Sequence, residues 1–77
     1  MQAGSRPDIS LYTYRVTWSV EDHQFVATCV EFPSLAWLAP SQIEALHGLQ
    51  ELLRDVVADM EEQGEQVPEP LAAGLRR

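Results

Sequence analysis

Cys29, Glu31 and two histidines are the side chains of this chain whose chemistry could support catalysis or metal binding. A thiol next to an imidazole can act as an activated nucleophile. The sequence does not favour such a pair, because Cys29 lies in an apolar segment, His23 in a polar turn and His47 on the polar side of a predicted helix. One cysteine and two distant histidines also lack the ligand spacing of a metal site. We therefore interpret Cys29 as a small hydrophobic core residue.

Clustered carboxylates are the other groups that could do chemistry, since two-metal nucleases need several acids converging on metals about 4 Å apart. The predicted strands offer only Glu31, because Glu21 and Asp22 lie in a turn and most other acids lie on a predicted helix. There is no glycine-rich phosphate loop. We predict no catalytic, metal or cofactor-binding residue, and hence no enzyme. Hydrolysis that depends on Glu31 is the enzymatic alternative.

The charge of the chain indicates its class of partner. Twelve acids and five arginines, with no lysine, give a net charge of -7. Nucleic-acid binding depends on cations that displace counterions from phosphates, so we expect no direct nucleic-acid binding. Eight acids lie in the second half of the sequence: Glu44, Glu51, Asp55, Asp59, Glu61, Glu62, Glu65 and Glu69. They form either a solvated surface that maintains solubility or a surface for a basic protein partner.

The length of 77 residues limits the chain to one domain with a marginal core, for which a partner or a second copy would add stability. No apolar run could cross a bilayer, and the N-terminus lacks the hydrophobic segment of a signal peptide. A single cysteine fits a reducing compartment. We expect a cytoplasmic protein with no membrane segment, whose domain spans 11–71 between a flexible lead-in over 1–10 and a tail over 72–77.

Two antiparallel strands that would position these side chains are predicted from alternating apolar and polar residues. Residues 11–19 have the period of a half-buried strand, and 25–30 form a second strand that is apolar or small on both faces. His23, in the turn between them, tolerates the positive φ of a tight hairpin. Pro33 is expected to end the second strand, because proline has no N–H to donate, and 35–38 can form a short third strand.

A long amphipathic helix follows. Ser41 and Glu44 have the spacing of a capping box, and Gly64 is placed to end the helix in the left-handed conformation. After the helix, Val67 could add a very short edge strand. One side of the helix is apolar: Leu46, Leu49, Leu53, Val56, Val57 and Met60. The opposite side is polar: Glu44, His47, Glu51, Asp55, Asp59 and Glu62.

One helix can cover only one face of the predicted sheet. Because the first strand is rich in aromatic residues and the second is apolar on both faces, we expect an uncovered apolar face that serves as a contact surface. At least one of Trp18 and Trp37 is expected on that face, as an interface anchor. The candidate partner-binding residues are Tyr12, Tyr14, Trp18, Trp37, Glu51, Asp55, Asp59 and Glu62.

Six short segments, in their order and spacing, resemble the HicB antitoxin family over Tyr12 to Leu71. They are Tyr-Arg-Val-Thr-Trp (14–18), the Glu-Asp turn (21–22), Phe-Val-Ala-Thr-Cys (25–29), Glu-Phe-Pro-Ser-Leu (31–35), Glu-Ala-Leu (44–46) and Val-Pro-Glu-Pro-Leu (67–71). The resemblance implies a partial ribonuclease-H-like domain. With the predicted elements this is an α+β fold, in which a small antiparallel sheet of three to four strands packs on one long amphipathic helix.

The resemblance also implies a non-catalytic antitoxin that neutralises a small basic HicA-type toxin, which cleaves messenger RNA, by direct protein contact. His23 stands where family members often have glycine. Many members carry a C-terminal DNA-binding segment that these 77 residues do not contain, so operator binding is not expected. We expect a homo-oligomer, a dimer or larger. The alternative is a stand-alone HicB-like oligomeric scaffold or regulatory subunit without a toxin partner.

Overall fold

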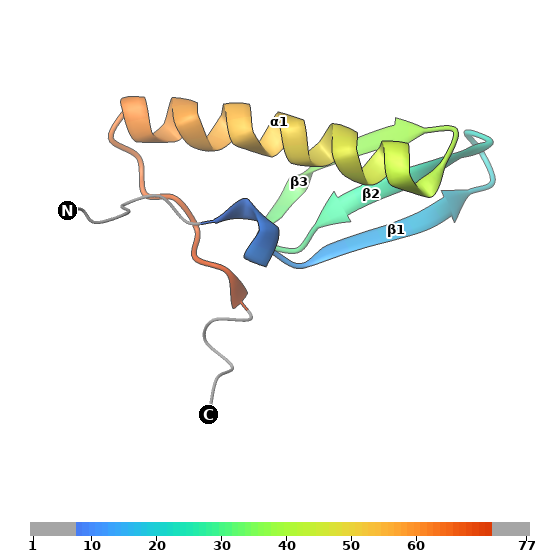
Figure 1. Ribbon diagram of the computed structural model, residues 1–77, viewed down its shortest axis with the longest axis horizontal. Helices are drawn as coiled ribbons and strands as arrows, with labels where there is room; N and C mark the ends of the chain where they lie inside the picture. The colour runs from blue at the N-terminus through green and yellow to red at the C-terminus, as the bar shows by residue number, and fades with distance from the viewer. Residues whose placement is uncertain (1–7, 72–77) are drawn as a thin grey trace.

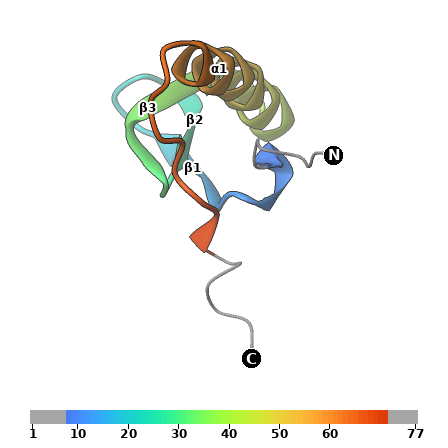
Figure 2. The ribbon, with the colours of Figure 1, turned by 90° about the vertical axis from the view of Figure 1, so that its left-hand side faces the viewer.

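The computed structural model describes residues 8–71, which form a three-stranded antiparallel sheet with one long helix across one of its faces (Figure 1). The view along the helix shows two layers (Figure 2). This arrangement confirms the predicted α+β fold of a small sheet on one amphipathic helix. The elements in chain order are the 3-10 helix η1 (Ile9–Leu11), the strands β1 (Tyr14–Ser19), β2 (Gln24–Cys29) and β3 (Phe32–Ala39), and the helix α1 (Gln42–Glu62).

The turn between β1 and β2 has the predicted conformation. His23 has a φ of 54°, and its backbone N–H donates to the Ser19 carbonyl over 2.9 Å. The Ser19 hydroxyl donates to the Asp22 carboxylate over 2.8 Å. A left-handed residue lets the turn follow the twist of the two strands.

β3 is longer than predicted, because it begins at Phe32 and therefore includes Pro33. β2 ends at Cys29, before Pro33, so the second strand does not continue through the proline. The prediction that the third strand covers only residues 35–38 is wrong, and two features allow Pro33 inside β3. β3 lies at the edge of the sheet, where a missing N–H disturbs fewer ladder bonds. The pairing with β2 also shifts between Thr28 and Cys29, so that residues 33–35 have no partner in the register.

The helix begins and ends where the sequence predicts. The Ser41 hydroxyl accepts a hydrogen bond from the Glu44 N–H over 3.1 Å. At the other end Gly64 has a φ of 77°, and the Glu65 N–H donates to the Met60 carbonyl over 2.8 Å. Such caps satisfy backbone groups that have no partner inside a helix. The strand predicted at Val67 is not formed, and this residue packs against the core.

The core lies between α1 and the sheet. Leu49, Leu53 and Val57 from the helix are at most 1% exposed, and Ala27 and Cys29 from β2 are equally buried. The small side chains on β2 let the helix lie close to the sheet, so its leucines fill the interior. Cys29 is therefore a core residue, as the sequence indicates, and its burial raises the pKa of the thiol.

The segment after α1, residues 65–71, folds back past one end of the sheet, and we call it the C-terminal strap (Figures 1 and 2). The Tyr12 hydroxyl donates to the Pro68 carbonyl over 2.7 Å, and the Tyr12 and Phe32 rings lie edge to face with their centroids 5.4 Å apart. The Leu71 N–H donates to the Glu31 carboxylate over 2.8 Å. These bonds hold the strap to Tyr12, just before β1, and to Glu31, between β2 and β3.

At the N-terminal side, residues 8–10 of the predicted lead-in belong to the η1 turn. The Asp8 carboxylate caps η1 by accepting from the N–H and hydroxyl of Ser10, which lowers the pKa of Asp8. Residues 1–7 of the lead-in and the predicted tail over 72–77 lie outside the described residues. Across residues 8–71, no helix has both the length and the apolar character needed to cross a membrane.

Candidate protein-binding surface

The face of the sheet turned away from α1 is half polar. It is formed by the strand residues that alternate with the buried ones, namely Arg15, Thr17, Val26, Thr28, Ala36 and Leu38. The uncovered face is therefore only partly apolar, where the sequence led us to expect an apolar face. The reason is that β1 turns all of its aromatic residues toward the helix and leaves arginine and threonine outside. The apolar residues of the open face therefore come only from β2 and β3. Among them Leu38 is 39% exposed.

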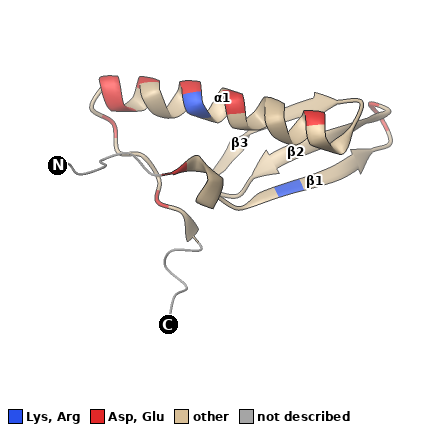
Figure 3. Ribbon diagram, viewed as in Figure 1, with Lys and Arg blue, Asp and Glu red and all other residues tan. Residues whose placement is uncertain are grey.

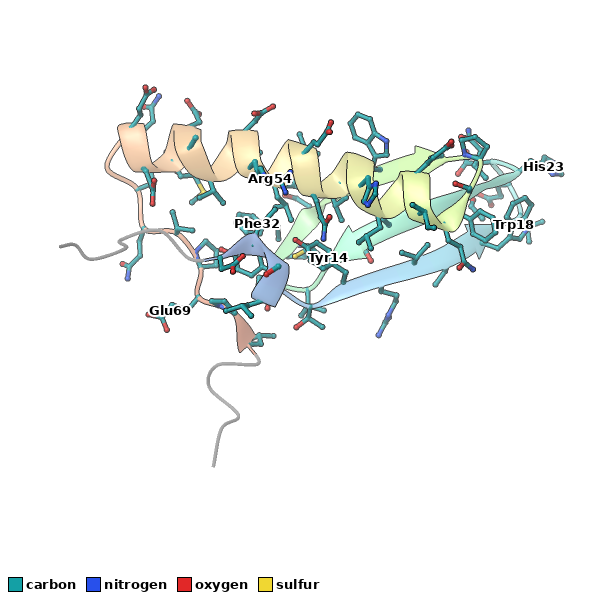
Figure 4. All side chains as sticks on the ribbon, in the orientation of Figure 1. Tyr14, Trp18, His23, Phe32, Arg54 and Glu69 are labelled. Atoms are coloured by element: carbon teal, nitrogen blue, oxygen red, sulfur yellow. The ribbon has the colours of Figure 1, made fainter. Side chains whose placement is uncertain are left out.

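Both tryptophans lie on the helix side of the sheet, which corrects the expectation that at least one of them faces away. Trp18 pairs with Phe25 across the strands, and the two ring centroids are 5.0 Å apart in an edge-to-face arrangement. Figure 4 shows Trp18 at the same end of the sheet as His23. Trp37 pairs with the buried Ala27. Each tryptophan nevertheless keeps about half of its surface exposed, 51% for Trp18 and 42% for Trp37.

Trp37 is held against the helix at Gly48. A Cβ atom at residue 48 would occupy the position of the indole Nε1 and Cδ1 atoms of Trp37. The indole therefore lies directly on the helix backbone, where any side chain would exclude it. Gly48 costs roughly 1 kcal/mol of helix stability relative to alanine, and this contact is the packing reason for the glycine.

The predicted acidic side of α1 is a single line of exposed carboxylates, which we call the acidic stripe: Glu44, Glu51, Asp55, Asp59 and Glu62. Together with Gly48 they follow steps of four, three, four, four and three residues. Five steps over 18 residues average 3.6, which is the period of the α-helix, so the stripe runs straight along the helix. Figure 3 shows acidic residues along α1 from its first turn to its last.

The flank of α1 that borders the acidic stripe at Glu51 has different chemistry. His47, Gln50 and Arg54 line a shallow depression of about 250 Å³ together with Glu51. Burial raises the pKa of Tyr14 to about 12, with a smaller opposing effect from a hydrogen bond to Gln50, so this flank faces β1. Gly48 and Trp37 place the acidic stripe on the flank that faces β3. Arg54 thus borders the acidic stripe at Glu51, and the other four carboxylates of the stripe do not line this depression.

Of the two tyrosines that the sequence places among the candidate binding residues, Tyr12 is buried and Tyr14 is half-buried. Tyr12 is 4% exposed, and its hydroxyl binds the C-terminal strap. The Tyr14 hydroxyl donates to the Ile9 carbonyl over 2.7 Å. Both hydroxyls therefore bind backbone carbonyls of the domain itself. The other candidates are exposed: Trp18, Trp37, Glu51, Asp55, Asp59 and Glu62.

Of the residues considered for catalysis, Cys29 and Glu31 lie together, and the two histidines lie elsewhere. Cys29 is buried, and its thiol donates to Glu31 over 3.4 Å. His23 lies in the hairpin turn and His47 on the exposed side of the helix. The Glu31 carboxylate accepts from the Thr13 N–H over 2.9 Å as well as from the strap. Within residues 8–71, no three histidine, cysteine or acidic side chains are grouped closely enough to hold a metal ion.

The comparisons with known proteins add no relative. No protein-family model, no curated protein and no solved structure matches this chain.

The contact between Gly48 and Trp37 is the feature of this surface that the sequence did not reveal. The available signal was a glycine inside an otherwise regular amphipathic helix, which indicates close packing at that position. Nothing in the sequence names the partner, because β3 and the middle of α1 are brought together only by the packing of the helix on the sheet.

Replacing Gly48 with alanine tests this contact, because its effect on the free energy of unfolding should have opposite signs with and without Trp37. In a Trp37→Ala protein, Gly48→Ala should raise the free energy of unfolding by about 1 kcal/mol, the ordinary helix-propensity gain. In the natural sequence the added methyl group displaces the indole, so the same substitution should lower the free energy of unfolding. Urea unfolding of the four proteins measures both changes. Equal stabilisation in the two backgrounds would show that the indole does not lie on Gly48.

Proposed function

We propose that this protein is a non-catalytic antitoxin of the HicB type, which neutralises a small basic HicA-type toxin by direct protein contact. The observation that carries the proposal is the acidic stripe. Five carboxylates lie in line on one helix. Of the two arginines among the described residues, Arg15 lies on the open face of the sheet and only Arg54 lies beside the stripe, next to Glu51. Such a field attracts a basic protein and speeds its association.

The order of elements supports the same proposal. A hairpin, a third strand and one long helix follow each other as the resemblance implies, and the quoted segments fall on β1, the turn after it, β2, the start of β3, the first turns of α1 and the strap. The carboxylate of Glu31 binds backbone and side-chain donors of the protein itself. The chemistry of the described residues therefore favours contact with a protein over catalysis.

A stand-alone oligomeric scaffold is the second candidate, and the open sheet favours it. β1 and β3 are both edge strands, and Leu38 is exposed beside Val26 on the uncovered face. Unpaired strand edges are templates for pairing with another chain. In this case the protein would assemble with copies of itself and need no toxin.

Co-expression with a HicA-type toxin separates the two candidates. For an antitoxin, growth should be restored and the two proteins should elute as one complex from a sizing column. Asp55→Lys with Asp59→Lys should then weaken the complex about tenfold, mainly through slower association that depends on salt. The matched control is Glu21→Lys with Glu69→Lys, which makes the same charge change outside the stripe. Separate elution and no rescue would contradict the antitoxin proposal, and a large self-assembly would support the scaffold.

A further inference from the structure

We infer that Trp37 is the anchor of the acidic stripe and that its exposed indole face receives an arginine side chain from a basic segment of a protein partner. The inference rests on the proposed function only for the identity of that partner. Its own basis is the placement of one aromatic ring among carboxylates.

The indole takes the place of a side chain missing from the stripe. Gly48 lies four residues after Glu44 and three before Glu51, so those two carboxylates leave the helix on either side of the position where Trp37 rests. One face of the ring lies on the backbone of Gly48, while 42% of the side chain remains exposed. The stripe is therefore an acidic line with an aromatic surface set into it.

This combination fits a guanidinium group better than other ligands. A cation attracted by the carboxylates can lie over the face of an indole, and arginine stacks on aromatic rings more often than lysine does. The planar guanidinium can also donate to a carboxylate beside the ring. Because the ring is already held on the helix, less side-chain freedom is lost when a partner binds.

A second copy of this chain is the less suitable occupant. The net charge of -7 means that two copies would bring acidic surfaces together at this stripe, and such like charges oppose association. Charge complementarity therefore points to a basic segment of a different protein.

Deca-arginine and deca-lysine peptides test the inference without a toxin. In a Trp18→Phe protein, tryptophan fluorescence reports on Trp37 alone. We expect saturable binding of deca-arginine at moderate salt, with a change in this fluorescence and weaker binding of deca-lysine. Trp37→Leu should weaken deca-arginine binding about fivefold and reduce the difference in affinity between deca-arginine and deca-lysine. Trp37→Tyr keeps an aromatic face and should retain most of the affinity for deca-arginine. Binding of the variants without Trp37 is followed by calorimetry.

A pair of charge variants keeps the test independent of how Trp37 variants fold. Glu44→Gln with Glu51→Gln, on either side of the ring, should weaken binding about tenfold. Glu21→Gln with Glu69→Gln should weaken it less than twofold, because these residues lie outside the stripe. The inference would be overturned if the two pairs of substitutions weakened deca-arginine binding equally, or if Trp37→Leu left that binding unchanged.

The toxin experiment distinguishes this failure from failure of the proposed function. A toxin complex that forms equally well with Trp37→Leu would support the antitoxin and overturn the role of Trp37. Peptide binding that depends on Trp37, with no complex formed by any HicA-type toxin, would support the surface and contradict the antitoxin.

Discussion

Leu53→Ala should lower the free energy of unfolding by about 3–4 kcal/mol and leave much of the protein unfolded at 25 °C. Leu53 is 0% exposed and lies near the middle of α1 among the other buried residues. Truncating a buried leucine loses its transfer free energy and leaves a cavity, together worth about 2–5 kcal/mol. A single core in a chain of 77 residues supplies only about 3–5 kcal/mol of net stability, so this loss is a large part of the total.

Urea unfolding followed by circular dichroism measures this effect, and Ile43→Ala is the matched control. Ile43 is a large apolar residue on the same helix, but it is 68% exposed. Its replacement should change the free energy of unfolding by less than about 0.5 kcal/mol, because little surface is returned to water. Similar losses for both variants would mean that α1 does not pack on the sheet through the Leu53 side.

Glu31→Gln should lower the free energy of unfolding by about 2 kcal/mol at neutral pH. The carboxylate accepts from the N–H groups of Thr13 and Leu71 and from the Thr13 hydroxyl, and so it joins the start of β1 to the C-terminal strap. Hydrogen bonds to a charged acceptor are worth more than neutral ones, about 1.5–3 kcal/mol each. An amide keeps the shape but not the charge, and it has only one oxygen to accept these bonds.

The pH dependence of the Glu31 effect has a definite sign. Burial alone would raise the pKa of Glu31, but the hydrogen bonds from Leu71, Thr13 and its own backbone outweigh this and hold the pKa below its ordinary value of 4.5. The folded state thus binds the proton less tightly than the unfolded state does. The stabilisation is fully present above the unfolded pKa and is lost as pH falls through the lower, folded pKa.

Urea unfolding at pH 7, 5 and 3 checks this prediction. The stability difference between the natural protein and Glu31→Gln should stay constant from pH 7 to 5 and narrow at pH 3. Glu69→Gln is the control, since Glu69 is exposed and Figure 4 shows it at the strap away from the helix. The free energy of unfolding of Glu69→Gln should equal that of the natural protein at each pH. A Glu31 difference that does not narrow in acid would contradict the proposed charge-assisted bonds.

Local signals in the sequence were sufficient for much of the fold. The Ser41 cap, the positive φ of His23 and the helix end at Gly64 each depend on a few neighbouring residues, and all three were confirmed. The length of β3 was not predicted, because the rule for Pro33 assumes regular pairing and takes no account of the register shift opposite Cys29. Whether a proline is tolerated depends on which strand lies at the edge, and that is a property of the whole sheet.

The sequence was sufficient to predict two strands, the helix and the acidic side of the helix, because a helical period of 3.6 and a strand period of 2 are visible along the chain. Which residues lie under the helix and which stay exposed was set by tertiary packing. The packing of α1 on the sheet drew Tyr14 and both tryptophans to the helix side, left a half-polar open face, and placed Trp37 on Gly48 in the acidic stripe. These contacts join residues on different elements. A local sequence pattern cannot predict them, because it does not contain the distant residue that will pack at a given position.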